Sequence, residues 1–278
     1  MNVTRAMRVG TALIASLCPA AWAPAVSLKP SQLEQVRLGV RVAAEIRRQE
    51  KILPSSDSRV KTVRMVGMRL LACFHDKAPW QWSFDVIDGR EINAFSLPGG
   101  PTFVFTGLLD KLKSEDELAA VLGHEMTHVR KQHWAYAYAD MELRGIGLSI
   151  LLGAAHANYD MYNTTDLLNS MYTLKFSRGD ETAADDGGFE LMSKAGYNPQ
   201  GMADVFQMLD DAQRGGSDPE FLSDHPSDKH RVSRIEGKIT ATGQKFPPEL
   251  PLAMDGYDRY FAEFYKPPVT STSAAAGG

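Results

Sequence analysis

Apolar side chains recur every three or four positions along two early stretches of the chain, Ser31 to Glu50 and Ser58 to Phe74. Because this spacing places them on one face of a helix, it predicts two amphipathic helices. Beyond Gly107 the same period returns and continues, with interruptions, to about Gly237. The pattern therefore predicts a mostly helical fold.

A different pattern separates the second predicted helix from the later ones. Apolar and polar residues alternate from Trp82 to Ile87, as they do in a half-buried strand. A second apolar run, Thr102 to Thr106, follows a Pro-Gly-Gly turn. The fold class we expect is α+β, mostly helical with a small β-sheet. A later apolar stretch, Ile146 to Ala157, is too short to span a membrane, and we expect a buried core helix rather than an interfacial segment there.

The two ends of the chain differ in composition from its centre. Two arginines precede a short apolar run and a small-residue sequence ending at Ala25, which is typical of a secretory signal peptide. We expect residues 1–25 to be a signal peptide, residues 26–237 to form one domain and residues 238–278 to be a C-terminal extension. The last stretch, Ser271 to Gly278, is of low complexity and is expected to be disordered.

The overall charge limits the partners to be considered. The 278-residue chain carries a formal charge of −4 and has no long run of basic residues. This argues against nucleic acid or an anionic membrane surface as its main partner.

The residues with the clearest chemistry lie on one predicted helix. Ser114 and Glu117 have the Ser-x-x-Glu spacing of a capping box, which marks the start of a helix. His124 and His128 are four positions apart, so at about 100° per residue both imidazoles point to one side and can share a metal ion. Glu125 flanks that position, where its carboxylate can take a proton from a water molecule held at the metal. The alternative is two histidines that are merely solvated on a helix face.

A zinc hydrolase needs three protein ligands and one open position, so a third ligand must come from elsewhere in the chain. The best candidate is Glu181, in a segment that leads into another predicted helix. Asp185 follows four residues later on the same helical face, where its carboxylate can accept the free ring N–H of His124 or His128. The alternative is that both acids are solvated on an exposed helix.

Three blocks of the sequence, in order, resemble peptidase family M48. The stretch Asn93–Gly100 is similar to the strand and turn before the family's active helix. Gly123–His128 is similar to its metal-binding helix, and Ser177–Asp185 to its third-ligand block. The resemblance runs from about Ser31 to Arg234.

The resemblance implies a zincin-type metallopeptidase domain with its small sheet next to the HExxH helix and one Zn²⁺ per chain. It implies the metal ligands His124, His128 and Glu181. Asp185 is implied to support a ligand or to handle protons. The residues Asn93 to Leu97 are expected to form an edge strand that aligns an extended peptide by main-chain hydrogen bonds.

A fourth block, His225-Pro226-Ser227 followed by Arg231, resembles a segment that lies near the metal cleft in the family. Three roles for His225 follow and remain open. The ring can stabilise the tetrahedral intermediate, close over the zinc as a latch, or only shape a loop.

The other histidines are assigned no metal role. His133 is five residues after His128, hence roughly 140° around the helix and off the metal face. His75, His156 and His230 have no partner at ligand spacing.

The function we expect is that of an exported, periplasmic zinc endopeptidase of the family's small exported branch. Its partners are expected to be protein or peptide substrates, namely unfolded or misassembled envelope proteins, and not nucleic acid. Peripheral association with the membrane or with outer-membrane assembly machinery is left open, as is the oligomeric state. The alternative is a latched, zinc-binding chaperone or scaffold with little proteolysis.

Overall fold

The computed structural model describes residues 29–75, 77–151, 175–217, 219–225 and 230–252. The expected signal peptide and the low-complexity C-terminus lie outside the described residues. The expected burial of Ile146–Ala157 also falls on side chains that are not described.

The two predicted amphipathic helices are confirmed. Helix α1 (Gln32–Gln49) begins at a capping box in which Ser31 accepts the N–H of Glu34, and the Glu34 carboxylate accepts the N–H of Ser31. Helix α2 (Ser58–Leu71) begins at Asp57, whose carboxylate accepts the N–H of Arg59. Each helix buries one face against the core, so the apolar period correctly located both elements.

The small sheet is also present, with three strands in the order β1–β3–β2. Strand β1 (Ser83–Ile87) pairs parallel to β3 (Pro101–Phe105), and the short strand β2 (Ala94–Ser96) pairs antiparallel to β3. The turn between β2 and β3 needs glycine at Gly99, because its φ is +89° and a Cβ there would lie 2.5 Å from the Cα of Val36 in α1.

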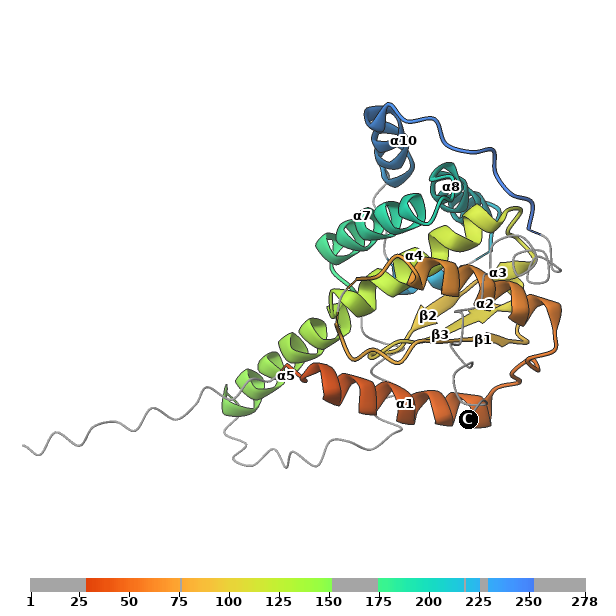
Figure 1. Ribbon diagram of the computed structural model, residues 1–278. Coiled ribbons are helices and arrows are strands. Elements are labelled where there is room, and N and C mark those ends of the chain that lie inside the picture. The colour runs from red at the N-terminus through yellow and green to blue at the C-terminus, as the bar shows by residue number, and fades with distance from the viewer. Residues whose placement is uncertain (1–28, 76, 152–174, 218, 226–229, 253–278) are drawn as a thin grey trace, which may run out of the picture.

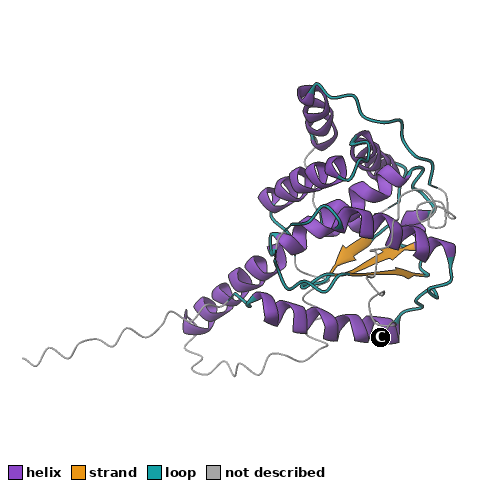
Figure 2. Ribbon diagram, viewed as in Figure 1, coloured by secondary structure: helices purple, strands orange, loops and turns teal. Residues whose placement is uncertain are grey.

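The helices cover both faces of this sheet (Figure 1, Figure 2). Helix α1 lies on one face, while α2 and α4 (Glu115–Arg130) cover the other. Helices α7 (Arg178–Lys194) and α8 (Gln200–Arg214) pack on the outer side of α4, and α10 (Arg231–Thr242) packs on α8. Helix α4 is therefore the centre of the molecule, with the sheet on one side and α7 and α8 on the other.

This position explains the unusual burial of α4, in which every residue from Glu115 to Val129 is buried. Its first turn is held by Ser114, which accepts the N–H of Glu117, while the Glu117 carboxylate reaches back to the N–H of Lys113. The segment after α10 also returns to this end of the helix, where Asp116 accepts the N–H of Leu250 at 2.7 Å. The start of the active helix is thus fixed by contacts from distant parts of the chain.

Helices α4 and α7 approach closely through two glycines. A Cβ on Gly188 would lie 2.9 Å from the backbone nitrogen of His124, and a Cβ on Gly123 would lie 3.3 Å from the Cα of Gly188. Glycine has no Cβ, so these two positions let the backbones of α4 and α7 come close together beside His124.

The expectation of one unbroken helix up to His133 is wrong. Helix α4 ends at Arg130, Gln132 has a left-handed φ of 58°, and α5 (His133–Leu151) begins directly afterwards. The Gln132 side-chain oxygen accepts hydrogen bonds from Lys29 at 2.9 Å and from Gln35 at 3.0 Å. These contacts from the beginning of the chain hold a conformation that a non-glycine residue seldom adopts.

Two short helices complete the described fold, and α10 bears on its expected limits. Helix α3 (Thr106–Leu109) follows β3 directly, and α9 (Glu220–Asp224) is a single short helix. Helix α10 continues across the expected domain boundary at residue 237 and ends at Thr242. Among the described helices, none combines the length and the apolar composition needed to cross a membrane.

Candidate metal centre

The two histidines of the HExxH sequence face the same point from α4, as their spacing predicts. The Nε2 atoms of His124 and His128 are 3.0 Å apart, and both rings are buried. Helix α4 lies between the sheet and α7, so neither histidine is on a solvent-exposed face of the helix. The alternative of two solvated histidines is therefore wrong.

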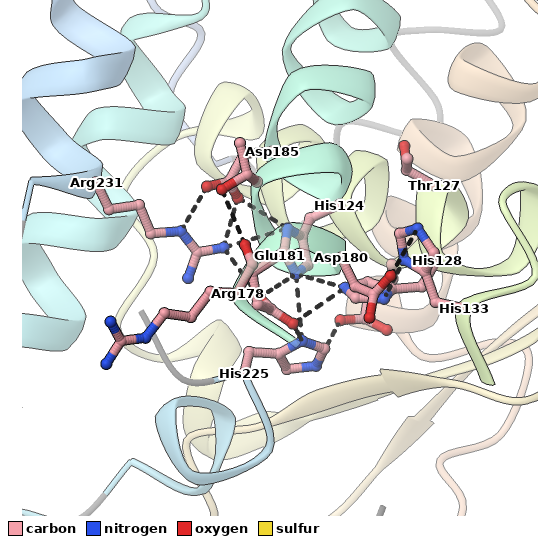
Figure 3. Close-up of polar contacts among 12 residues, drawn as sticks. His124, Thr127, His128, His133, Arg178, Asp180, Glu181, Asp185, His225 and Arg231 are labelled. Atoms are coloured by element: carbon pink, nitrogen blue, oxygen red, sulfur yellow. Dashed lines mark hydrogen bonds and ion pairs between the residues drawn. The ribbon is translucent and has the colours of Figure 1, made fainter. Parts of the chain in front are cut away.

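Glu181 joins this pair from the first turn of α7 (Figure 3). Its Oε2 lies 3.4 Å from Nε2 of His124, and its Oε1 lies 3.5 Å from Nε2 of His128. Glu181 and Asp185 are both buried, so the alternative of two exposed acids is also wrong. The Ser177 capping box fixes the start of α7 and with it the position of Glu181.

His225 comes to the same point from the end of α9. Its Nδ1 lies 3.0 Å from Oε1 of Glu181 and 3.3 Å from Nε2 of His124, and the ring is buried. Phe221 stacks on the His225 ring with their centroids 4.6 Å apart. A histidine in a solvent-exposed loop would make none of these contacts, so the structure places His225 in the centre together with the other three residues.

The four side chains His124, His128, Glu181 and His225 fit a tetrahedral metal ion. One donor atom of each lies within 4.8 Å of the donor atoms of the others. Ligands at about 2.0–2.1 Å from a tetrahedral ion are separated by about 3.3 Å, close to the separations observed here. Oε2 of Glu181 is buried without a hydrogen-bond partner in the described residues, and it faces the ring nitrogens. A bound cation would satisfy that oxygen and the lone pairs of the rings together.

Glu125 lies beside the four donors without being one of them. Its Oε1 is 3.2 Å from Nε2 of His225, and the side chain is buried. This contact does not have hydrogen-bond geometry, and Oε1 has no hydrogen-bond partner among the described residues. The carboxylate is therefore available to accept a proton at the edge of the metal position.

Asp185 supports His124 from behind, as the spacing on α7 predicts. Its Oδ1 lies 3.0 Å from Nδ1 of His124, the ring nitrogen that faces away from the other donors. Arg231 binds the same carboxylate with two nitrogens at 2.8 and 2.5 Å, and Arg234 adds a contact at 2.5 Å. Burial alone would raise the pKa of Asp185, but Arg231 and His124 lower it to about 2. The carboxylate thus stays charged while fully buried.

Sequence reasoning missed two residues that complete the centre. His133 contacts His128 through their Nδ1 atoms at 2.9 Å, although the helical angle predicted a position off the metal face. The expectation failed because the helix is interrupted at Gln132, between α4 and α5. Phe176 packs against the centre, with its ring centroid 4.2 Å from that of His128 and 5.5 Å from that of His225. No local pattern in the sequence indicates either contact, since both depend on how α5 and α7 begin.

Burial and neighbouring charges shift the protonation of the centre in opposite directions. Burial lowers the pKa of His128 well below its usual range, and His124 and His225 lower it further. Burial alone would also lower the pKa of His225, but Glu125 and Glu181 raise it to about 10. The pKa of Glu181 is lowered, because the attraction of His225 and a hydrogen bond with His124 outweigh its burial. His128 is thereby kept neutral, the form that can bind a metal, whereas His225 is charged in the metal-free centre and must release a proton to bind one.

Comparisons with known proteins agree with this geometry. The model of a family described as peptidase family M48 matches residues 57–239. The chain is 37% identical over 188 residues to the mitochondrial metalloendopeptidase OMA1 of Schizosaccharomyces pombe, an alignment that covers 67% of this chain and 55% of that protein. It is 31% identical over 181 residues to the beta-barrel assembly-enhancing protease of Escherichia coli, which covers 62% of this chain and 37% of that protein.

The chain spans only part of these relatives, between 37% and 55% of their lengths. The family match nevertheless covers well over half of the chain and includes all four converging side chains. The fold is that of a zincin-type domain, mostly helical with a small sheet beside the HExxH helix. The resemblance read from the sequence is confirmed, and the chain belongs to peptidase family M48.

Proposed function

We propose that the protein is a zinc-dependent endopeptidase in which His124, His128 and Glu181 hold the metal. The observation that carries this proposal is the convergence of these three donors beside the buried carboxylate of Glu125, whose Oε1 has no hydrogen-bond partner among the described residues. When bound, zinc would lower the pKa of a coordinated water and polarise a peptide carbonyl. Two imidazoles and one carboxylate are a donor set typical of catalytic zinc.

Glu125 is proposed as the general base and then the general acid. Its carboxylate lies beside the donor cluster, with its Oε1 3.2 Å from Nε2 of His225. From this position it can accept the proton of the attacking water and deliver it to the departing amine. Burial keeps bulk water away from the carboxylate while it holds the proton.

His225 is proposed to act as a latch that occupies the fourth metal position. Its Nδ1 lies among the three other donors, where a substrate carbonyl or a water molecule would otherwise bind. Helix α9 is attached near strand β2, because the N–H of Phe221 is 3.3 Å from the carbonyl oxygen of Ile92, and Asn93 donates to Asp224 at 3.3 Å. Both hydrogen bonds are long, but Phe221 of α9 is buried in the hydrophobic core. Opening the latch therefore exposes that ring, and substrate binding has to offset this cost.

Strand β2 is proposed to align an extended substrate. In its pairing with β3, the N–H of Leu97 donates to the carbonyl of Pro101 at 2.7 Å, and the carbonyl of Asn93 accepts the N–H of Phe105 at 3.0 Å. In antiparallel pairing the intervening residues Ala94 and Ser96 direct their N–H and C=O groups to the opposite edge. No described strand pairs along that edge. An unfolded segment can add there as a further strand, which favours cleavage of flexible or unfolded chains.

The proposed substrates are unfolded or misassembled proteins of the cell envelope, and the proposed location is the periplasm after export. The name of one relative, a beta-barrel assembly-enhancing protease, supports a role in the assembly of envelope proteins, whereas the names of the mitochondrial metalloendopeptidases support only the protease activity. The same likeness supports association with outer-membrane assembly machinery. The second candidate is a latched zinc-binding chaperone, and the position of His225 at the fourth donor favours it.

The test compares degradation of a reduced, unfolded protein by the zinc-loaded wild type, Glu125→Gln and His225→Ala. We expect the wild type to cleave, Glu125→Gln to bind zinc without cleaving, and His225→Ala to cleave faster. His75→Ala is the matched control, because His75 is exposed and takes no part in the centre. Zinc binding by all proteins with cleavage by none would contradict the peptidase proposal and favour the chaperone. Lower activity of His225→Ala would contradict the latch and favour transition-state stabilisation.

A further inference from the structure

His133 is buried beside the centre, although it is not one of the four residues whose donor atoms converge there. Only 6% of its surface is exposed, and it is the first residue of α5. The left-handed residue Gln132 redirects the chain between α4 and α5, and this turns the His133 ring back toward His128. The two rings meet nearly at right angles, with their planes at 82° and their centroids 4.8 Å apart.

The contact between the two rings constrains where their protons lie. The Nδ1 atoms are 2.9 Å apart, so one must donate and the other must accept. Nε2 of His128 points at the donor cluster, 3.0 Å from Nε2 of His124 and 3.5 Å from Glu181, and must present a lone pair to bind a metal. The proton of a neutral His128 therefore lies on Nδ1 and is donated to Nδ1 of His133.

Asp180 favours the same arrangement from the other side of His133. The remaining proton of His133 then lies on Nε2, which faces Oδ1 of Asp180 at 3.7 Å. The other oxygen of Asp180 is held by the N–H of Ser177 at 3.1 Å and its hydroxyl at 2.7 Å. This capping contact fixes the carboxylate in front of His133, one residue before Glu181.

We infer that His133 is a positioning residue, which accepts the N–H of His128 and so fixes the tautomer and ring orientation in which His128 Nε2 can bind the metal. Asp185 occupies the corresponding place behind His124, at 3.0 Å from its Nδ1. Each histidine of the HExxH sequence then has its own partner behind the ring, a carboxylate for one and an imidazole for the other. Such partners raise the metal affinity of the ring that they orient. The inference rests on the proposed zinc site.

The experiment measures zinc affinity by competition with a chromophoric chelator for the wild type, His133→Leu and His133→Asn. Leu and Asn have the same branched shape, but only Asn offers an oxygen near the place of the His133 Nδ1. Because loss of such a partner costs about 10–100-fold in metal affinity, we expect that loss in His133→Leu and a loss of less than about threefold in His133→Asn. The cobalt-substituted proteins should differ in the same order, with a changed visible spectrum in His133→Leu alone.

Equal zinc affinity of His133→Leu and the wild type would overturn the inference. Equal losses in both variants would also overturn it, because they would indicate packing of the imidazole against Phe176 rather than hydrogen bonding. If His133→Leu fails to fold, His133→Asn still decides, since a loss of tenfold or more in a folded His133→Asn contradicts the accepting role. Absence of zinc binding by the wild type would instead contradict the proposed function, so the two failures are distinguishable.

Discussion

At the scale of single residues, the orientation of the donor histidines depends on the side chains that contact their Nδ1 atoms. Asp185 is buried completely, yet it remains charged because Arg231 and Arg234 bind it and His124 contacts it. A carboxylate in this position orients the His124 ring, and its own orientation is fixed by the two arginines. The same ion pairs connect α10 to α7, so the Asp185 side chain links the candidate metal centre to the last helix of the described residues.

Replacing Asp185 with Asn tests this role. We expect zinc affinity to fall about 10–100-fold, because the amide cannot orient His124 and bind both arginines as the carboxylate does. Stability should fall by about 3–5 kcal/mol, since buried guanidinium groups lose their counter-charge. Chelator competition and urea denaturation measure the two effects. Asp186→Asn is the matched control, because Asp186 is half-exposed, pairs with Lys238 and contacts Arg234 only at 3.7 Å, so its loss should cost less than about 1 kcal/mol. Equal effects of both substitutions would contradict the prediction.

At the scale of elements, the crossing of α4 and α7 positions the third donor. Gly123 and Gly188 let the two helices approach, and this contact lies between Glu181 and the end of α7. A larger residue at the crossing would move α7 away from α4 and with it Glu181 away from the histidine pair. The sequence located strand β2 and helices α4 and α7, but it did not indicate how closely α4 and α7 pack.

Replacing Gly188 with Ala should therefore reduce stability and zinc affinity together. The added Cβ would lie 2.9 Å from the backbone nitrogen of His124, which cannot yield as a flexible side chain would. Overpacking of this kind costs about 1–3 kcal/mol. Gly237→Ala in α10 is the control, because nothing lies within 4 Å of its Cβ position. We expect that change to stabilise the protein by about 0.5–1 kcal/mol. A stabilising Gly188→Ala, measured by the same denaturation, would show that the helices are not in close contact.

At the scale of the whole molecule, the four donors connect three separate parts of the chain. His124 and His128 come from α4, Glu181 from α7 and His225 from the end of α9. A metal ion held by all of them joins these elements as a crosslink does. Its binding energy stabilises the folded state, because the donors converge only when the chain is folded.

Chelation should therefore lower the thermal unfolding temperature, and added zinc should restore it. Zinc at a thousand times its dissociation constant stabilises a folded protein by about 4 kcal/mol. At about 2–4 °C per kcal/mol for a domain of this size, the shift is easily measured by calorimetry. Glu125→Gln should keep the full shift, whereas His124→Ala should lose it. An unfolding temperature that does not respond to chelation would indicate that the four residues hold no metal.

Much of the fold and of the candidate centre follows from local patterns. The periods of apolar residues located α1, α2, β1 and β3, and the HExxH spacing put two imidazoles on one face of α4. These are properties of a few adjacent residues, which backbone geometry alone determines. The tertiary structure decided what depends on distant contacts. Gln132 is held by Lys29 and Gln35, and the resulting break turns His133 toward His128. The docking of α9 brings His225 to the other donors, and no period or spacing in the sequence encodes either approach.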